Sequence, residues 1–338
     1  MLRSRLESSI DRSTVAVGRV IRPAALFGIA AAAALWPGSG YEAAGLWLWA
    51  ASLVVVGMPH GAYDLSAAVR ERGGPGRAAP VLAAYCVITL AGVAALLAAP
   101  AWTLAVFLVL SAHHFGVSDS VLTRGRTRFG AAAHAGAFGR GLVVIGSPLA
   151  FHGSAAWEPF AVIAGAFGAE TAGVSAWVGV AGAVGAVLGA VLVGIGLVGT
   201  RAGGRSSAEE LAVVGGAAAL AWAAPPLLAV GVYFVVVHAS GHCLRGLDPR
   251  GPTSRPGVRN AARVHAESLW LLAPSVLAVL AAAPMFGGWT ARGIALSFLA
   301  FCAAATLPHH LLWLGVLRSG LLPRGRTAEG LGGAAVGV

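Results

Sequence analysis

Lysine is absent from this sequence, and charged residues are scarce overall. Of the 338 residues, 11% are charged and 57% are hydrophobic, whereas a soluble domain carries about 25% charged residues. This composition excludes an ordinary soluble domain and is typical of a protein that crosses a membrane several times. The net charge of +10 comes from arginines between apolar segments, where they set membrane orientation, so we expect no nucleic-acid partner.

Cysteine is nearly absent too. Cys86, Cys243 and Cys302 share no close spacing, which excludes a disulfide framework and a CxxC metal knuckle. The pattern of a cleavable signal peptide is also missing, because residues 1–22 are polar with scattered charges. We therefore expect residues 1–22 and 318–338 to be cytoplasmic tails, with one transmembrane domain over residues 23–317.

Apolar runs, by contrast, are abundant. The 48 glycines allow membrane helices to pack closely. We expect an all-α, polytopic transmembrane helical bundle of about 8–10 spans, each able to cross roughly 30 Å of hydrocarbon. The Pro225–Pro226 pair predicts a tight turn between helices, and the apolar segment 158–170 is expected to be re-entrant or interfacial. The expected spans are 23–37, 43–64, 78–99, 101–119, 130–150, 174–200, 208–225, 227–245, 266–284 and 293–317.

Arginines follow the even-numbered spans and are nearly missing after the odd-numbered ones. Arg292 is the clear exception, and Arg140 falls inside the fifth span. By the positive-inside rule, this alternation places both termini in the cytoplasm. We expect a multi-pass protein of the cell membrane, surrounded by the lipid bilayer.

Histidines gather in four of these apolar segments. Histidine is costly inside a bilayer, so each is a functional candidate. All four segments lie toward the cytoplasmic ends of even-numbered spans, so they share one depth and can form one metal site if those helices are neighbours. The motifs are Pro59-His60-Gly61-Ala62-Tyr63-Asp64, His113-His114-Phe115-Gly116-Val117-Ser118-Asp119, His238-Ala239-Ser240-Gly241-His242 and Pro308-His309-His310.

Spacing narrows the choice among these histidines. His238 and His242 are four residues apart, which puts both on one helix face where they can bind the same ion. His113 and His114 point about 100° apart around a helix, so only one of them should face the site. The later His-His pair poses the same choice.

Two carboxylates accompany the histidines. Asp64 lies four residues after His60 and is placed to accept a hydrogen bond from the ring nitrogen that does not bind metal; the alternative is a helix-end carboxylate solvated by water. Asp119 is a second candidate for the same supporting role. The three histidines outside the motifs are expected at helix ends or surfaces, with reach to the site as an alternative for the one near the cytoplasmic end of the fifth span. They are His134, His152 and His265.

A site of imidazoles without thiolates suits Fe, Zn, Cu or Ni. The HExxH motif is absent, and apolar surroundings suit Fe(II) acting on O2 and an apolar substrate. Other interpretations stay open. A membrane desaturase or hydroxylase would need more histidine boxes, including HxxHH. A haem electron carrier would pair two histidines from facing helices, a transporter would spread its histidines over several depths, and a structural membrane protein would carry them incidentally.

In this order, the four motifs resemble those of the Brp/Blh family of membrane-embedded β-carotene 15,15′-dioxygenases. The resemblance covers roughly residues 45–317 and rests on PHGAxD, HFGxxD, the paired histidines and the later PH. It implies that Fe(2+) is the cofactor and that β-carotene and O2 are the substrates. The central double bond would be cleaved to give two molecules of all-trans-retinal.

The resemblance also implies roles for individual residues within a catalytic domain over 23–317. His309 would be an alternate ligand or a near-site residue, and His113 and His310 are the other members of the doubled pairs. A functional link to a rhodopsin that uses the retinal is suggested, and the oligomeric state is left open. The implied iron ligands are His60, His114, His238 and His242.

Overall fold

The computed structural model of the protein describes residues 21–36, 38, 40–124, 130–200, 204–245 and 258–314. The two expected tails lie outside these residues, apart from Ile21 and Arg22. Within the described residues the chain is helical and contains no strand. The expected all-α helical bundle is therefore confirmed.

Each expected span coincides with a helix or with a run of consecutive helices. α9 ends at Ala223 and α10 begins at Pro226, which confirms the turn predicted at the proline pair. In chain order the helices are Ile21–Leu35, α2 (Gly40–Ser52), η1 (Leu53–Gly57), α3 (Met58–Glu71), α4 (Pro75–Ala98), α5 (Pro100–Arg124), α6 (Ala131–His152), α7 (Ser154–Ala166), α8 (Ala172–Gly199), α9 (Gly204–Ala223), α10 (Pro226–Tyr233), η2 (Phe234–Ala239), α11 (Ser240–Arg245), α12 (Val258–Ala282), η3 (Ala283–Phe286) and α13 (Ala291–Trp313).

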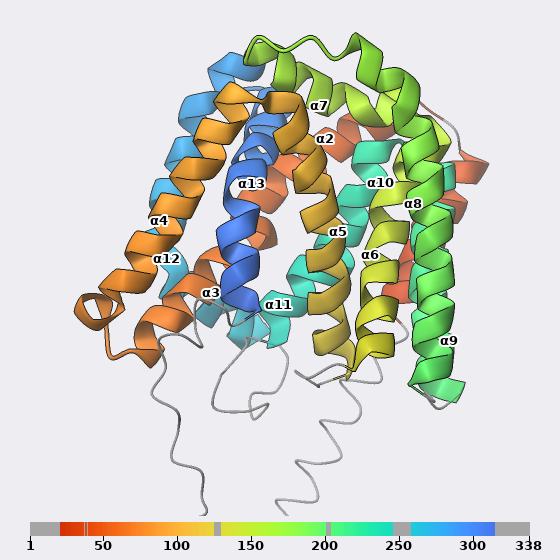
Figure 1. Ribbon diagram of the computed structural model, residues 1–338, viewed down its shortest axis with the longest axis horizontal. Helices are drawn as coiled ribbons and strands as arrows, with labels where there is room; N and C mark the ends of the chain where they lie inside the picture. The colour runs from red at the N-terminus through yellow and green to blue at the C-terminus, as the bar shows by residue number, and fades with distance from the viewer. Residues whose placement is uncertain are drawn as a thin grey trace, which may run out of the picture.

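Seven segments of the described chain are long and apolar enough to cross a membrane. The other three expected spans are also helical, but the helix Ile21–Leu35 is short, α6 contains Arg140, and α9 begins with charged residues. α7, with 13 residues, is too short to span about 30 Å and lies at one end of the bundle (Figure 1). Its length fits the re-entrant or interfacial segment expected there.

Close packing of α5 against α6 fixes the position of the first His-His pair. Gly116 of α5 faces the backbone of Ala137 in α6, and Gly141 of α6 faces the backbone of Ala112. A side chain at either glycine would overlap the facing carbonyl group, so the two helices approach each other at van der Waals distance. The glycine of the HFGxxD motif therefore serves helix packing.

Replacing Gly116 with valine should destabilise the protein. The added side chain cannot fit against Ala137 without moving α6, and overpacking a buried contact typically costs about 1–3 kcal/mol. The midpoint of thermal unfolding in detergent would fall. Gly194→Val is the matched control, because Gly194 on α8 has open space where the side chain would go. Equal midpoints for the two variants would contradict this account of the packing.

A buried ion pair joins α6 to α9. Nε of Arg140 donates to Oε1 of Glu210 at 2.7 Å, and the second nitrogen of the guanidinium contacts the other carboxylate oxygen. A bidentate pair of this kind is among the strongest charge-assisted contacts. It explains how an arginine is tolerated inside the fifth expected span, since its charge is compensated within the protein.

Candidate metal centre

The four histidine motifs meet inside the bundle. They lie on α3, α5, the η2–α11 segment and α13, and the rings form one cluster. Ring nitrogens of His60, His114 and His238 all lie within 4.8 Å of one another, and all three residues are buried. The ring of His242 is 4.9 Å from that of His238 and 5.3 Å from that of His60. The structure thus brings together all four histidines that the family resemblance implied as ligands.

Hydrogen bonds hold two of these rings with one nitrogen directed at the cluster. Nδ1 of His60 donates to the carbonyl of Val56 at 3.1 Å, and Nδ1 of His238 donates to Oδ1 of Asp119 at 2.9 Å. In each neutral ring the proton is on Nδ1, so Nε2 keeps its lone pair. This tautomer is the one required for binding a metal through Nε2.

Several buried ring nitrogens have no hydrogen-bond partner among the described residues. They are Nε2 of His114, Nε2 of His238, and both ring nitrogens of His242. Buried polar atoms are normally hydrogen-bonded, and leaving one unsatisfied costs about 1–3 kcal/mol. A cation bound between these nitrogens would satisfy them, so the donor set fits a metal that favours imidazole.

Asp119 links the cluster to a second buried side chain. While Oδ1 accepts from His238, Oδ2 accepts a hydrogen bond from the hydroxyl of Tyr233 at 2.7 Å. Ser118 beside it donates to the carbonyl of His114 at 2.6 Å. Asp119 therefore occupies the outer position that the sequence suggested for it, and Tyr233 is a partner that no sequence signal had indicated.

Asp64 lies beside the cluster, near a different histidine from the one expected. Its Oδ2 is 3.8 Å from Nδ1 of His309, while Nδ1 of His60 donates to a backbone carbonyl. Asp64 is one helical turn beyond His60 on α3, and at that level its side chain lies near α13. The carboxylate is buried and belongs to the surroundings of His309.

The doubled histidines separate into inner and outer members. The ring centre of His309 is 4.7 Å from that of His114 and 5.4 Å from that of His60. His114 and His309 are therefore the inner members, meaning those that belong to the buried cluster. Outside them, Nδ1 of His113 is 2.8 Å from Nε2 of His310, and Nε2 of His113 is 3.0 Å from Nε2 of His134. His134 is exposed. Nδ1 of His310 lies 3.1 Å from Nδ1 of His114, so His310 connects the outer histidines to the inner ones.

Two π-helical turns position the ligand-bearing helices. η1 directly precedes α3, which carries His60, and η2 contains His238. The two turns contact each other. Each contains three consecutive valines, and β-branched residues crowd a regular α-helix. Such single wide turns occur often at functional sites, and the valine runs are the signal from which they could have been suspected.

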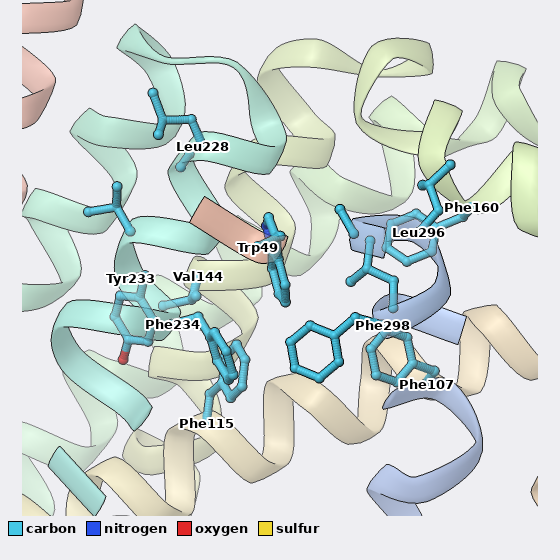
Figure 2. Packing of buried hydrophobic residues seen from close by; sticks show 14 of the residues in the cluster. Trp49, Phe107, Phe115, Val144, Phe160, Leu228, Tyr233, Phe234, Leu296 and Phe298 are labelled. Atoms are coloured by element: carbon cyan, nitrogen blue, oxygen red, sulfur yellow. The ribbon is translucent and has the colours of Figure 1, made fainter. Parts of the chain in front are cut away.

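An apolar cavity of about 450 Å³ adjoins the histidines, within the usual size of a ligand pocket. His60, His114, His238 and His309 contribute to its wall. Much of the rest is aromatic: Figure 2 shows Phe298 between Phe107 and the Phe115–Phe234 pair. Phe115 and Phe234 are both part of the wall. Trp313 packs instead against His114, with ring centres 6.2 Å apart.

The two remaining histidines lie apart from the centre. Nε2 of His152 bonds the carbonyl of Ala221 at 2.7 Å. Nδ1 of His265 lies 2.8 Å from the carbonyl of Ala261, and its Nε2 lies 3.2 Å from the carbonyl of Val54. Both rings contact backbone oxygens away from the histidine cluster.

The whole of this centre falls within a region that matches a known family. A family model described as beta-carotene 15,15'-dioxygenase matches residues 51–315, well over half of the chain. The chain belongs to the beta-carotene 15,15'-dioxygenase family. Searches of curated proteins and of solved structures found no match.

Membership of the beta-carotene 15,15'-dioxygenase family confirms the resemblance drawn from the four motifs. The matched region contains all the clustered histidines, both carboxylates and nearly the whole cavity wall. Family membership favours an enzyme that acts on a carotene. It disfavours the alternatives of a haem carrier, a transporter and a structural protein. The aromatic cavity beside the histidines is consistent with so apolar a substrate.

Proposed function

We propose that this protein cleaves the central double bond of β-carotene with O2 and releases two molecules of all-trans-retinal. The observation that carries the proposal is a buried imidazole cluster that lines an apolar cavity. In the reaction the central carbon–carbon double bond breaks and each of its carbons receives one oxygen atom of O2. No reductant is consumed, because both oxygen atoms of O2 end up in the two aldehyde products.

We further propose that the cofactor is Fe(2+), held by His60, His114, His238 and His242, with His309 beside it as an alternate ligand. Iron bound there would supply the oxygen chemistry. The chain provides orientation and exclusion of water. Val56 and Asp119 keep two of the imidazoles in the required tautomer.

The wall of the cavity would bind the polyene. Phe115 packs against His238 with ring centres 4.5 Å apart, and Phe234 stacks on Trp49 at 5.1 Å. Flat aromatic faces beside the ligands hold a conjugated chain by dispersion and exclude water from it. The proposed catalytic domain extends over residues 23–317, in the cell membrane and with both termini in the cytoplasm.

The direct test is expression in bacteria that accumulate β-carotene. We expect the orange colour to disappear and retinal to appear in cell extracts, while a His238→Ala variant expressed to the same level stays orange. Unchanged carotene in cells with well-expressed wild-type protein would refute the proposal. Metal analysis of the purified protein distinguishes iron from zinc, and a Soret band would instead indicate a haem carrier.

A further inference from the structure

The cavity reaches the outer surface of the bundle on one side. Its wall includes Cys86 and Leu90 of α4, together with Pro274 of α12. Cys86, Leu90 and Pro274 are exposed on the outside of the molecule, so the same side chains belong to the cavity and to the surface. The cavity therefore has a mouth between α4 and α12.

The packing of the surrounding helices accounts for this mouth. α4 is held on α13, where a side chain at Gly92 would collide with the backbone of Ala304, and α12 is held mainly on α3. α4 and α12 lie at the same side of the bundle in Figure 1, but they are not among the extensively packed helix pairs of the described chain. Pro274 lies inside α12, where it removes one backbone hydrogen-bond donor.

The surface around the mouth is apolar. On α4, Val87 and Leu97 are more than half exposed, and on α12 Leu269 and Leu277 are 60% and 66% exposed. Both helices are long and apolar enough to cross a membrane, so these side chains face hydrocarbon. A molecule that enters here comes from the lipid and not from water.

The two ends of the cavity are lined by different kinds of side chain. Near the mouth the wall is formed by smaller or half-buried residues such as Ser275 and Thr89. Elsewhere it consists of Trp49, Phe107 and Phe298, which are buried aromatic residues (Figure 2). A long, thin hydrocarbon fits this plan, since one end can reach the aromatic wall while the other remains near the mouth.

We propose that the opening between α4 and α12 is a lateral entrance through which a membrane-dissolved polyene passes from the bilayer to the histidine centre. This inference rests on the proposed function and adds the route to it. Cys86 marks the entrance with a natural thiol, so the route can be obstructed reversibly in the intact protein.

The test uses the full-length protein in liposomes that contain β-carotene. Modifying the thiols with benzyl methanethiosulfonate should slow retinal formation by about tenfold, and reduction with dithiothreitol should restore it, which excludes misfolding as the cause. The Cys86→Ser protein should resist the reagent. In the matched control, Cys86→Ser/Val87→Cys, the benzyl group is attached one residue away on the lipid side of α4, and the rate should not change.

A second measurement needs no turnover. In metal-free protein, β-carotene in the bilayer should slow labelling of Cys86 but not of the cysteine placed at position 87. If the wild type forms retinal while benzyl modification leaves its rate unchanged and carotene gives no protection, the entrance is overturned. If carotene protects Cys86 but no retinal forms with iron present, the entrance stands and the proposed function fails.

Discussion

Retinal formation should be abolished by His114→Ala and should survive His113→Ala. The two residues are neighbours on α5, yet Nε2 of His114 is directed into the buried cluster, while the ring of His113 lies between His134 and His310. Loss of His114 removes a proposed ligand. Loss of His113 removes a contact outside the centre, which should cost less than about tenfold, the low end for outer-shell residues.

The measurement is retinal produced per molecule of protein, together with metal content. Both variants should reach the membrane at wild-type levels, because each replaces one ring on the same helix by alanine. His114→Ala should also bind less iron. An inactive His113→Ala with a fully active His114→Ala would show that the inner and outer members of the pair have been assigned the wrong way round.

Asp119→Asn should weaken metal binding by about 10–100-fold, as is typical when the outer partner of a metal-bound histidine is lost. The carboxylate accepts two hydrogen bonds, from Nδ1 of His238 and from the hydroxyl of Tyr233. An amide has one accepting oxygen, so it cannot satisfy both donors. His238 then loses either its fixed tautomer or its fixed orientation.

The readout is iron retained per protein during dialysis against a graded series of chelator concentrations. Tyr233→Phe is the matched control, since it removes one hydrogen bond and leaves the one to His238. Its effect should be smaller than that of Asp119→Asn. Equal iron retention by Asp119→Asn and the wild type would contradict a positioning role for Asp119.

The helices could be predicted from the sequence because their signals are local. Apolar runs bounded by arginines marked each span, and Pro225–Pro226 marked one turn. Which helices are long and apolar enough to cross was harder to judge, since α6 contains a buried arginine. Its charge is compensated by Glu210, a residue 70 positions away that composition cannot connect to it.

In the site too, the features that depend on local sequence could be predicted, and those that depend on helix packing could not. The pairing of His238 with His242 follows from helix geometry alone, and their rings do lie 4.9 Å apart. The choice between His309 and His310 depends on how α13 is rotated against α3 and α5, which no local pattern determines. The contact of Tyr233 with Asp119 and the approach of Asp64 to His309 likewise depend on helices that are distant in sequence.

The π turns η1 and η2 set the direction in which the histidines of their helices point. Each residue of a regular helix turns the following side chains by about 100°, and a π turn offsets that rotation by one extra residue. His60 and His238 face each other because each follows or occupies such an offset. Both helices must keep their offsets together, since straightening only one would turn its imidazole away from the other.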